Sequence, residues 1–193
     1  MKKLILATAL VAMAIGGSAF AQLNWEDNIG LYFDEGATSY CGTAPIGFTH
    51  AFLVLTHCTS PSVGGWEAKV TFEGGVTQTA AALYGLTINA ATRPNEFIVG
   101  LGQPLVAVNG SVVLADFTLY ATGGPGYGFV GPVYFDSLQN NLPAYLDGND
   151  PELVKPMLPS LGGIFDPVLI VNGDCGPVDN EDASFGGVKA LFR

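Results

Sequence analysis

The stretch Trp66-Glu67-Ala68-Lys69-Val70-Thr71-Phe72-Glu73 decides the fold class. Every second residue from Trp66 to Phe72 is apolar, and the residues between them are charged or carry a hydroxyl group. This period of two is the pattern of a β-strand with one face packed on a core and the other in water. The stretch therefore predicts a strand, and Gly74-Gly75 after it predicts a turn.

Further short apolar runs lie on both sides of this strand, separated by turn residues. The chain contains 26 glycines and 12 prolines, and Asn109-Gly110 is a strong hairpin signal. Ala80–Leu83 is also compatible with a helical turn, which we consider the weaker interpretation. Together the runs predict an all-β chain that forms a single β-sandwich with Greek-key or jelly-roll connections. The expected strands are Ile29–Phe33, Phe48–Thr56, Val76–Leu83, Glu96–Val99, Leu105–Val108, Ser111–Ala121, Phe129–Phe135 and Val168–Val171.

The strand pattern weakens between Asp136 and Pro167, where five prolines interrupt the chain. Proline lacks the amide proton that a central strand or helix requires. We expect a long irregular excursion with one short strand at Ala144–Leu146 and one helical turn near Glu152–Lys155. The segment Phe185–Phe192 is expected to return as an edge strand.

The first 21 residues have the order of an export signal. Lys2 and Lys3 precede an apolar run from Leu4 to Ile15, and Ala19-Phe20-Ala21 forms a small-x-small cleavage site. The run is too short for a membrane-spanning helix, so an uncleaved anchor is the weaker interpretation. We expect cleavage after Ala21, no membrane span in the mature chain, and a secreted, periplasmic or cell-surface location. Residues 22–193 are long enough for one domain.

The chain is acidic, with 7 basic and 17 acidic residues and a net charge of −10. Without Lys2 and Lys3 the mature chain has 5 basic against 17 acidic residues, which gives −12. Such a surface repels phosphate backbones and anionic lipid, so nucleic acid is not an expected partner.

Three cysteines, Cys41, Cys58 and Cys175, allow three disulfide pairings. Outside the cytoplasm a bridge can persist. Cys41 and Cys58 flank the strand expected at Phe48–Thr56, and we predict that they pair. Cys175 is then left over.

Known catalytic and zinc-binding patterns are absent from the sequence. His50 and His57 lie seven residues apart, which places them on opposite faces of one strand. We expect His50 near the core and His57 at the strand end. A serine-hydrolase elbow is missing, and no pair of acids stands in a recognisable glycosidase context. Gly123–Gly128 lacks the lysine of a phosphate-binding loop, so we interpret it as an ordinary loop. We therefore predict no enzymatic activity.

Two groups of residues are candidates for binding. Calcium prefers oxygen ligands, and one acidic loop offers them. The residues of this loop are Asp147, Asn149, Asp150 and Glu152. A solvated loop that binds no cation is the alternative interpretation. Aromatic rings can stack on a sugar, and four lie in or near the irregular half of the chain, where core packing is an equal alternative: Tyr127, Phe129, Tyr134 and Tyr145.

Two stretches resemble known proteins. The run Phe52–Thr56 followed by Gly65–Val70 is similar to the opening of cohesin-like β-sandwiches, and the ending Phe185–Arg193 resembles the C-termini of small exported bacterial proteins. Cohesins dock a partner domain, so the first resemblance implies a binding module. We therefore expect a non-catalytic module that binds a glycan or a protein at the cell surface. The alternative is a structural subunit that self-associates in an envelope or extracellular assembly.

Overall fold

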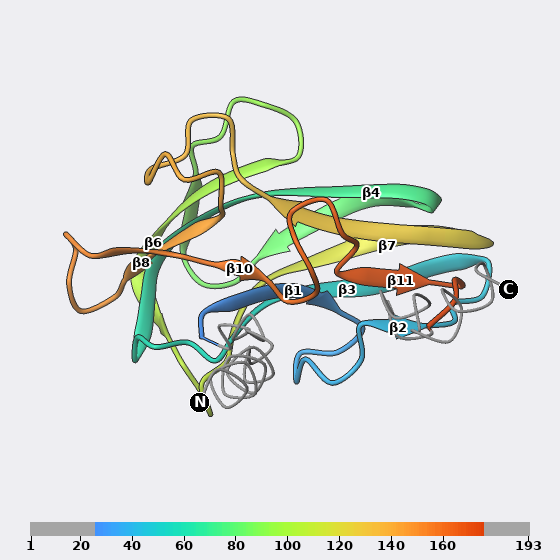
Figure 1. Cartoon of the computed structure of the whole chain (residues 1–193), viewed down its shortest axis with the longest axis horizontal. Coiled ribbons are helices and arrows are strands. Elements are labelled where there is room, and N and C mark those ends of the chain that lie inside the picture. Colours follow the sequence, from blue (N-terminus) through green and yellow to red (C-terminus); the bar gives the residue numbers. More distant parts are fainter. Residues whose placement is uncertain (1–25, 176–193) are drawn as a thin grey trace, which may run out of the picture.

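The computed structural model describes residues 26–175, and every regular element in that range is a β-strand. Figure 1 shows them arranged in two layers. The predicted signal at residues 1–21 and the edge strand expected at Phe185–Phe192 lie outside the described residues. Within residues 26–175 no helix has the length and hydrophobicity needed to cross a membrane. The strands are β1 (Asn28–Tyr32), β2 (Cys41–Gly42), β3 (Gly47–Thr56), β4 (Ser62–Leu83), β5 (Thr87–Asn89), β6 (Glu96–Val106), β7 (Val112–Gly131), β8 (Ala144–Asp147), β9 (Val154–Pro156), β10 (Leu158–Pro159) and β11 (Leu169–Val171).

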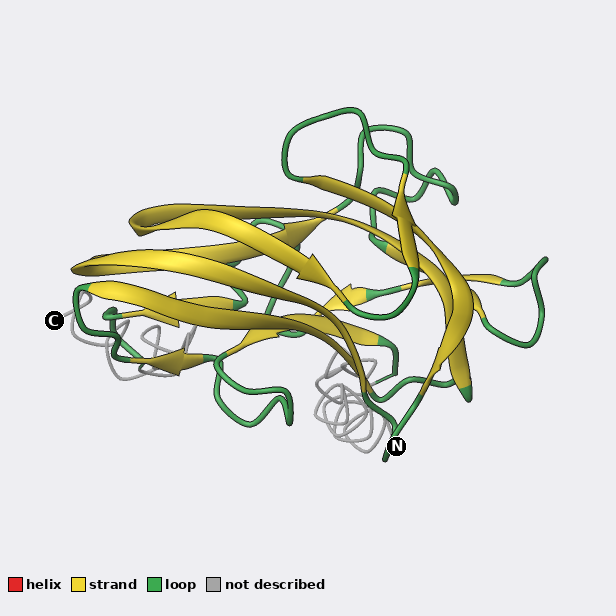
Figure 2. Cartoon of the chain, turned by 180° about the vertical axis from the view of Figure 1, so that it is seen from behind, coloured by secondary structure: helices red, strands yellow, loops and turns green. Residues whose placement is uncertain are grey.

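Two long strands, β4 and β7, pair with each other and belong to both layers. Their antiparallel register runs from Lys69↔Gly131 to Gly74↔Gly126 and continues from Val76↔Ala121 to Leu83↔Ala115. Both strands run to one end of the molecule and fold back there, as Figures 1 and 2 show. The two expected strands at 66–73 and 76–83 are therefore halves of one strand that changes layer.

Glycines make this fold-back possible, and we call Gly74, Gly75 and residues 123–126 the glycine bend. Gly74 and Gly123 have φ values of +71° and +89°, which disfavour other residues. A Cβ atom on Gly75 would lie 2.2 Å from the carbonyl oxygen of Gly124. Gly74-Gly75 therefore turns the chain as expected, whereas the interpretation of Gly123–Gly128 as a loop was wrong. That segment lies within β7, where its glycines permit close approach to β4.

The first layer contains β5, β6, the first half of β4, and β8 with β9; the second contains β10, β1, β3, the first half of β7 and the second half of β4. The second half of β7 pairs with β11, which also pairs with β2. The all-β sandwich prediction is confirmed.

The core lies between the layers. Trp66, Ala68 and Val70 are buried as the period of two predicts. Phe117 on β7 contacts the rings of Phe72 and Phe97 at centroid distances of 5.6 and 5.5 Å. These contacts join the two layers directly.

The excursion after β7 contains more strand than expected. The short strand predicted at Ala144–Leu146 is confirmed as β8. The helical turn predicted at Glu152–Lys155 is wrong, because Val154–Pro156 pairs antiparallel with β8 as strand β9. The contact continues past Pro156, where the amide of Met157 donates to the carbonyl oxygen of Pro143 at 2.8 Å.

The predicted disulfide between Cys41 and Cys58 is wrong, because Cys41 pairs with Cys175 across 134 positions. The ten residues of β3 separate the first two cysteines, and a strand of that length spans about 33 Å. The parallel pairing of β2 with β11 instead places Cys41 beside Ile170, near Cys175. Cys58 is a half-buried free thiol that donates to the carbonyl oxygen of Ser60 at 3.1 Å.

Candidate functional site

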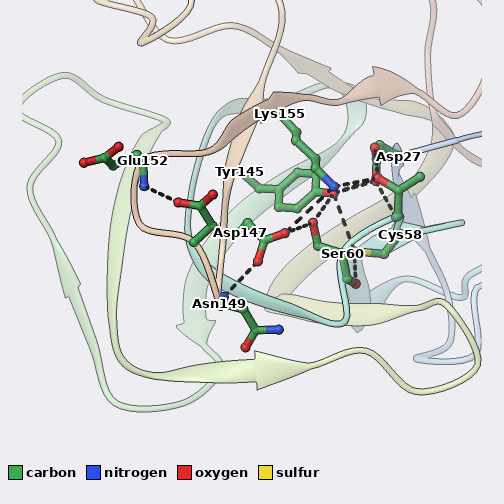
Figure 3. A network of polar contacts seen from close by, with 10 residues as sticks. Asp27, Cys58, Ser60, Tyr145, Asp147, Asn149, Glu152 and Lys155 are labelled. Carbon is green, nitrogen blue, oxygen red and sulfur yellow. Dashed lines mark hydrogen bonds and ion pairs between the residues drawn. The ribbon is translucent and has the colours of Figure 1, made fainter.

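A polar network surrounds the hydroxyl group of Tyr145 where β8 meets β1 and the β3–β4 loop (Figure 3). Tyr145 is 1% exposed. Its hydroxyl donates to Oδ1 of Asp27 at 2.7 Å and lies 3.2 Å from Oγ of Ser60. Burial is the main cause that raises the pKa of Tyr145, so the hydroxyl stays protonated. The Tyr145 network therefore ties three segments that are distant in sequence.

Asp147 forms the second half of this network. Its Oδ2 accepts from Oγ of Ser60 at 2.6 Å, and its Oδ1 accepts from the amide of Asn149 at 2.8 Å. The hydrogen bond from Ser60 is the main cause that lowers the pKa of Asp147. Lys155 Nζ lies 3.9 Å from the same Oδ2 and donates to Oγ1 of Thr59 at 3.0 Å.

The chemistry of the Tyr145 network suits holding strands together. The hydroxyl of Ser60 donates a hydrogen bond to Asp147, and its side-chain partners within residues 26–175 are Asp147 and Tyr145, neither of which is a histidine base. Burial raises the pKa of the Cys58 thiol, so it is a weak nucleophile at neutral pH. Each polar group in the network has a partner of complementary type, which is how buried polar groups stabilise a fold.

The acidic loop predicted to bind calcium contributes its carboxylates to separate hydrogen bonds. Those of Asp147 are described above, and Oδ1 of Asp150 accepts from the amide of Glu152 at 3.0 Å. Within residues 26–175 no three His, Cys, Asp or Glu side chains are placed to share a metal ion. Calcium binding through Asp147, Asn149, Asp150 and Glu152 stays a prediction.

A concave groove of about 480 Å³ lies on the outer face of the first layer, and we call it the outer groove. It crosses β5, β6, β4, β8 and β9, and its lining is mostly aliphatic and glycine, with Trp66, Tyr145, Glu67 and Ser137 as the other members. Ile88 on β5 is 76% exposed, and Ile98, Leu146 and Val154 are half-buried around the same hollow. The opposite faces of these strands carry core residues such as Val99 and Tyr145.

Glycines form the floor of the outer groove. Gly65 on β4 pairs with Gly100 on β6, so neither strand raises a side chain between the walls. A Cβ atom on Gly65 would lie 2.8 Å from the carbonyl oxygen of Val99, whereas one on Gly100 would meet no atom within 4 Å. The space above Gly100 therefore belongs to the groove.

Two polar residues of the groove lining, Glu67 and Ser137, bond to each other. Glu67 is 6% exposed, and its carboxylate accepts from the amide and hydroxyl groups of Ser137, both at 2.7 Å. Beyond it, the amide of Tyr134 donates to Glu96 at 3.1 Å. The guanidinium of Arg93 lies 3.5 Å from the centroid of the exposed Tyr134 ring. The loop 132–137 is thus held against β4 and β6.

The structure separates the four aromatic residues predicted to bind a ligand. Tyr145 is buried in its network, and Tyr127 and Phe129 are half-buried on β7. Tyr134 is exposed near the outer groove, packed edge-on against Phe135. Ligand binding by Tyr127, Phe129, Tyr134 and Tyr145 stays a prediction. The prediction that His50 lies near the core is also wrong, because its ring is exposed and pairs with Asp116 at 2.9 Å.

The sequence did not lead us to predict the outer groove. Isolated glycines within strand patterns often mark a bulge or a close backbone approach. Gly65 and Gly100 carried that signal, and both flank shifts in the β4–β6 register. The apolar residues Ile88 and Ile98 gave no sign of their exposure, because burial depends on which strands cover a face.

Comparison with known proteins gives one structural similarity. No protein-family model matches the chain, and no curated protein sequence matches it. Among solved structures, the chain is similar to a cohesin module of a family 33 glycoside hydrolase from Clostridium perfringens, with 8% identity and a TM-score of 0.42. The match covers 68% of this chain and 90% of that module.

Proposed function

We propose that this chain is a non-catalytic binding module of an exported protein, and that it binds an extended protein segment in the outer groove. The observation that carries the proposal is a concave aliphatic surface left open on the outer face of a sheet. Exposed apolar hollows with a polar rim mark binding sites more often than random surface does.

The lining of the groove favours a protein over a glycan. Its accessible apolar side chains include Ile88, Ile98, Leu146 and Val154, which suit branched apolar side chains, whereas the two aromatic residues of its lining, Trp66 and Tyr145, are 3% and 1% exposed. Sugars are bound mainly by aromatic platforms beside polar groups. The ring of Tyr134 lies outside the groove lining, and Arg93 covers one of its faces.

The negative charge of the chain favours a positively charged protein segment as the partner. The net charge is −10, and Glu67 is a lining residue of the groove. Complementary charge speeds association and suppresses wrong partners. We therefore expect the bound segment to carry aliphatic anchor residues and flanking lysine or arginine.

Two features support a location outside the cytoplasm. The first 21 residues have the pattern of an export signal. The Cys41–Cys175 bridge is of the kind that persists in oxidising compartments.

A peptide selection tests this function. The mature chain is panned against a phage-displayed library of random 12-residue peptides, and enriched peptides are titrated by fluorescence polarisation. The matched variant is Gly100→Leu, which fills the groove where the structure has open space. Phe48→Ser, on the second layer, is the control.

We expect basic, aliphatic peptides whose affinity falls at least about tenfold for Gly100→Leu and stays unchanged for Phe48→Ser. Enriched peptides that bind Gly100→Leu as tightly as the wild type contradict the proposal. Failure to enrich peptides, together with binding on a glycan array, contradicts it in favour of the glycan alternative.

A further inference from the structure

The second half of β4, Val76–Leu83, has one hydrogen-bonding edge that no strand within residues 26–175 covers, and we call it the β4 edge. On one side it pairs with β7 from Val76↔Ala121 to Leu83↔Ala115. Among the described strands none pairs with it on the other side, since β6 and β8 contact only the first half of β4. Thr77 and residues 79–82 are exposed.

Four short outermost strands of the described sheet are protected in ways that the β4 edge is not; the stretch Gly47–Ala51 of β3, which pairs with β7 alone among the described strands, is a second uncovered edge. β2 and β10 have two residues each, and β5 and β9 have three. β9 carries Lys155 and ends at Pro156, and β10 ends at Pro159. Short length, lysine and proline are the common devices that prevent pairing between sheet edges. The β4 edge has eight residues and contains none of these residue types.

The composition of the β4 edge permits close approach of a second strand. Its sequence, Val-Thr-Gln-Thr-Ala-Ala-Ala-Leu, contains no charge and no large side chain at its centre. Two copies of an acidic protein repel each other over most surfaces. The β4 edge itself carries no charged side chain, and Asp116, which lies opposite Ala82 on the adjoining strand, hydrogen-bonds to His50.

We propose that the β4 edge pairs with the β4 edge of a second copy of this chain. An antiparallel arrangement about a two-fold axis brings the same residues together from both copies, as a closed dimer requires. About half of the amide and carbonyl groups of an edge strand face outward, and pairing satisfies them. The second layers of two copies then form one continuous sheet.

A bulge limits this interface. The β4–β7 register shifts between Gln78 and Ala80, and the hydroxyl of Thr79 donates to the carbonyl oxygen of Thr118 at 3.0 Å. The dimer therefore gains regular pairing over part of the edge. One strand pair buries less than the roughly 1,200 Å² of a stable interface, so the dimer is weak, with a dissociation constant in the micromolar range or above.

Sedimentation velocity of the mature chain between about 10 μM and 1 mM tests the dimer, combined with hydrogen exchange at both concentrations. Ala81→Lys places a charge at the centre of the edge, and Thr77→Lys is a second variant with a solvent-facing side chain. Ile88→Lys, on the edge of the first layer, is the matched control. Circular dichroism confirms that each variant folds.

We expect dimers at high concentration, with amide protection gained over residues 76–83. Both edge variants should weaken dimerisation at least tenfold, and Ile88→Lys should not. A monomer at 1 mM overturns the proposal. So do dimers that both edge variants leave intact, and amides of residues 76–83 that are protected equally at all concentrations. Because Ile88 lines the outer groove, a dimer that is lost in Ile88→Lys and kept in both edge variants places the contact at the groove and also overturns the proposal.

Discussion

The two halves of β4 differ in environment although they are continuous in the chain. The first half lies inside a layer, with β6 on one side and β8 and β7 on the other, and apolar and polar side chains alternate along it from Trp66 to Glu73. Among the described strands the second half has only β7 as a neighbour, and its exposed residues are two threonines and three alanines. The comparison teaches that side chains alternate with a period of two where a second layer covers one face of the strand. A strand can pair with its neighbours without that alternation.

Removal of Trp66 should show the largest effect. Trp66 is 3% exposed and stacks on Phe97 at a centroid distance of 5.8 Å. We expect Trp66→Ala to lower the free energy of unfolding by about 3–5 kcal/mol, measured by urea denaturation. Ala81→Ser, in the exposed half, should change it by less than about 0.5 kcal/mol. If Trp66→Ala and Ala81→Ser lower the free energy of unfolding by similar amounts, the two halves of β4 do not differ in the way described above.

A side chain at the glycine bend should show the next largest effect. A Cβ atom at position 75 meets the backbone of Gly124, which cannot rotate away as a side chain can. We expect Gly75→Val to cost at least about 2 kcal/mol in urea denaturation. Gly100→Val, where space is open, is the control and should stay near the wild-type value.

The Tyr145 network offers a smaller test of the first layer. Tyr145→Phe keeps the ring and removes the hydroxyl that donates to Asp27. We expect a loss of about 1–2 kcal/mol. Tyr120→Phe, on an exposed position, should have almost no effect in the same urea titration. A loss in Tyr120→Phe equal to that in Tyr145→Phe argues against the network.

The carboxylate of Asp147, in the same network, predicts that the stability of the fold depends on pH. Its pKa is lowered from 3.8 in the folded state, so its contribution to stability is present above pH 3.8 and is lost as pH falls through the folded pKa. Thermal midpoints measured from pH 6 down to pH 2.5 should therefore fall more for the wild type than for Asp147→Asn. Parallel curves for the two proteins contradict this role.

Calcium should have the smallest effect. Both oxygens of Asp147 already accept hydrogen bonds, so a cation has to displace them. We expect 5 mM calcium to raise the thermal midpoint by no more than about 1 °C. A larger rise that is absent in Asp150→Asn shows that the acidic loop binds the ion.

The sequence predicted the strands well where side chains alternate or are continuously apolar, as at Trp66–Phe72 and Phe48–Thr56. It did not predict that 66–73 and 76–83 form one strand, because glycine signals a turn without showing whether pairing continues through it. The helical turn near Glu152 was wrong since the pairing partner β8 lies several residues away. Helix and strand differ there by a tertiary contact that no local pattern reports.

The candidate sites were harder to predict for the same reason. Cys41 meets Cys175 only because β2 and β11 pair in parallel. Tyr145 occupies an irregular, proline-rich segment in sequence, yet it is among the most buried residues. The outer groove depends on Gly65 opposing Gly100, a register that the sequence does not reveal.

The sharing of β4 and β7 between the layers has a consequence for how the protein unfolds. Each layer contains one half of β4 and one half of β7. If one layer unfolded, the other would lose the continuation of two of its strands, so neither layer is expected to unfold alone. The equilibrium transition should therefore be a single cooperative step for the whole domain. The pairing of Asn28 with Leu158 adds a contact between opposite ends of the described chain, and contacts of such long sequence separation place the protein among slowly folding β-topologies.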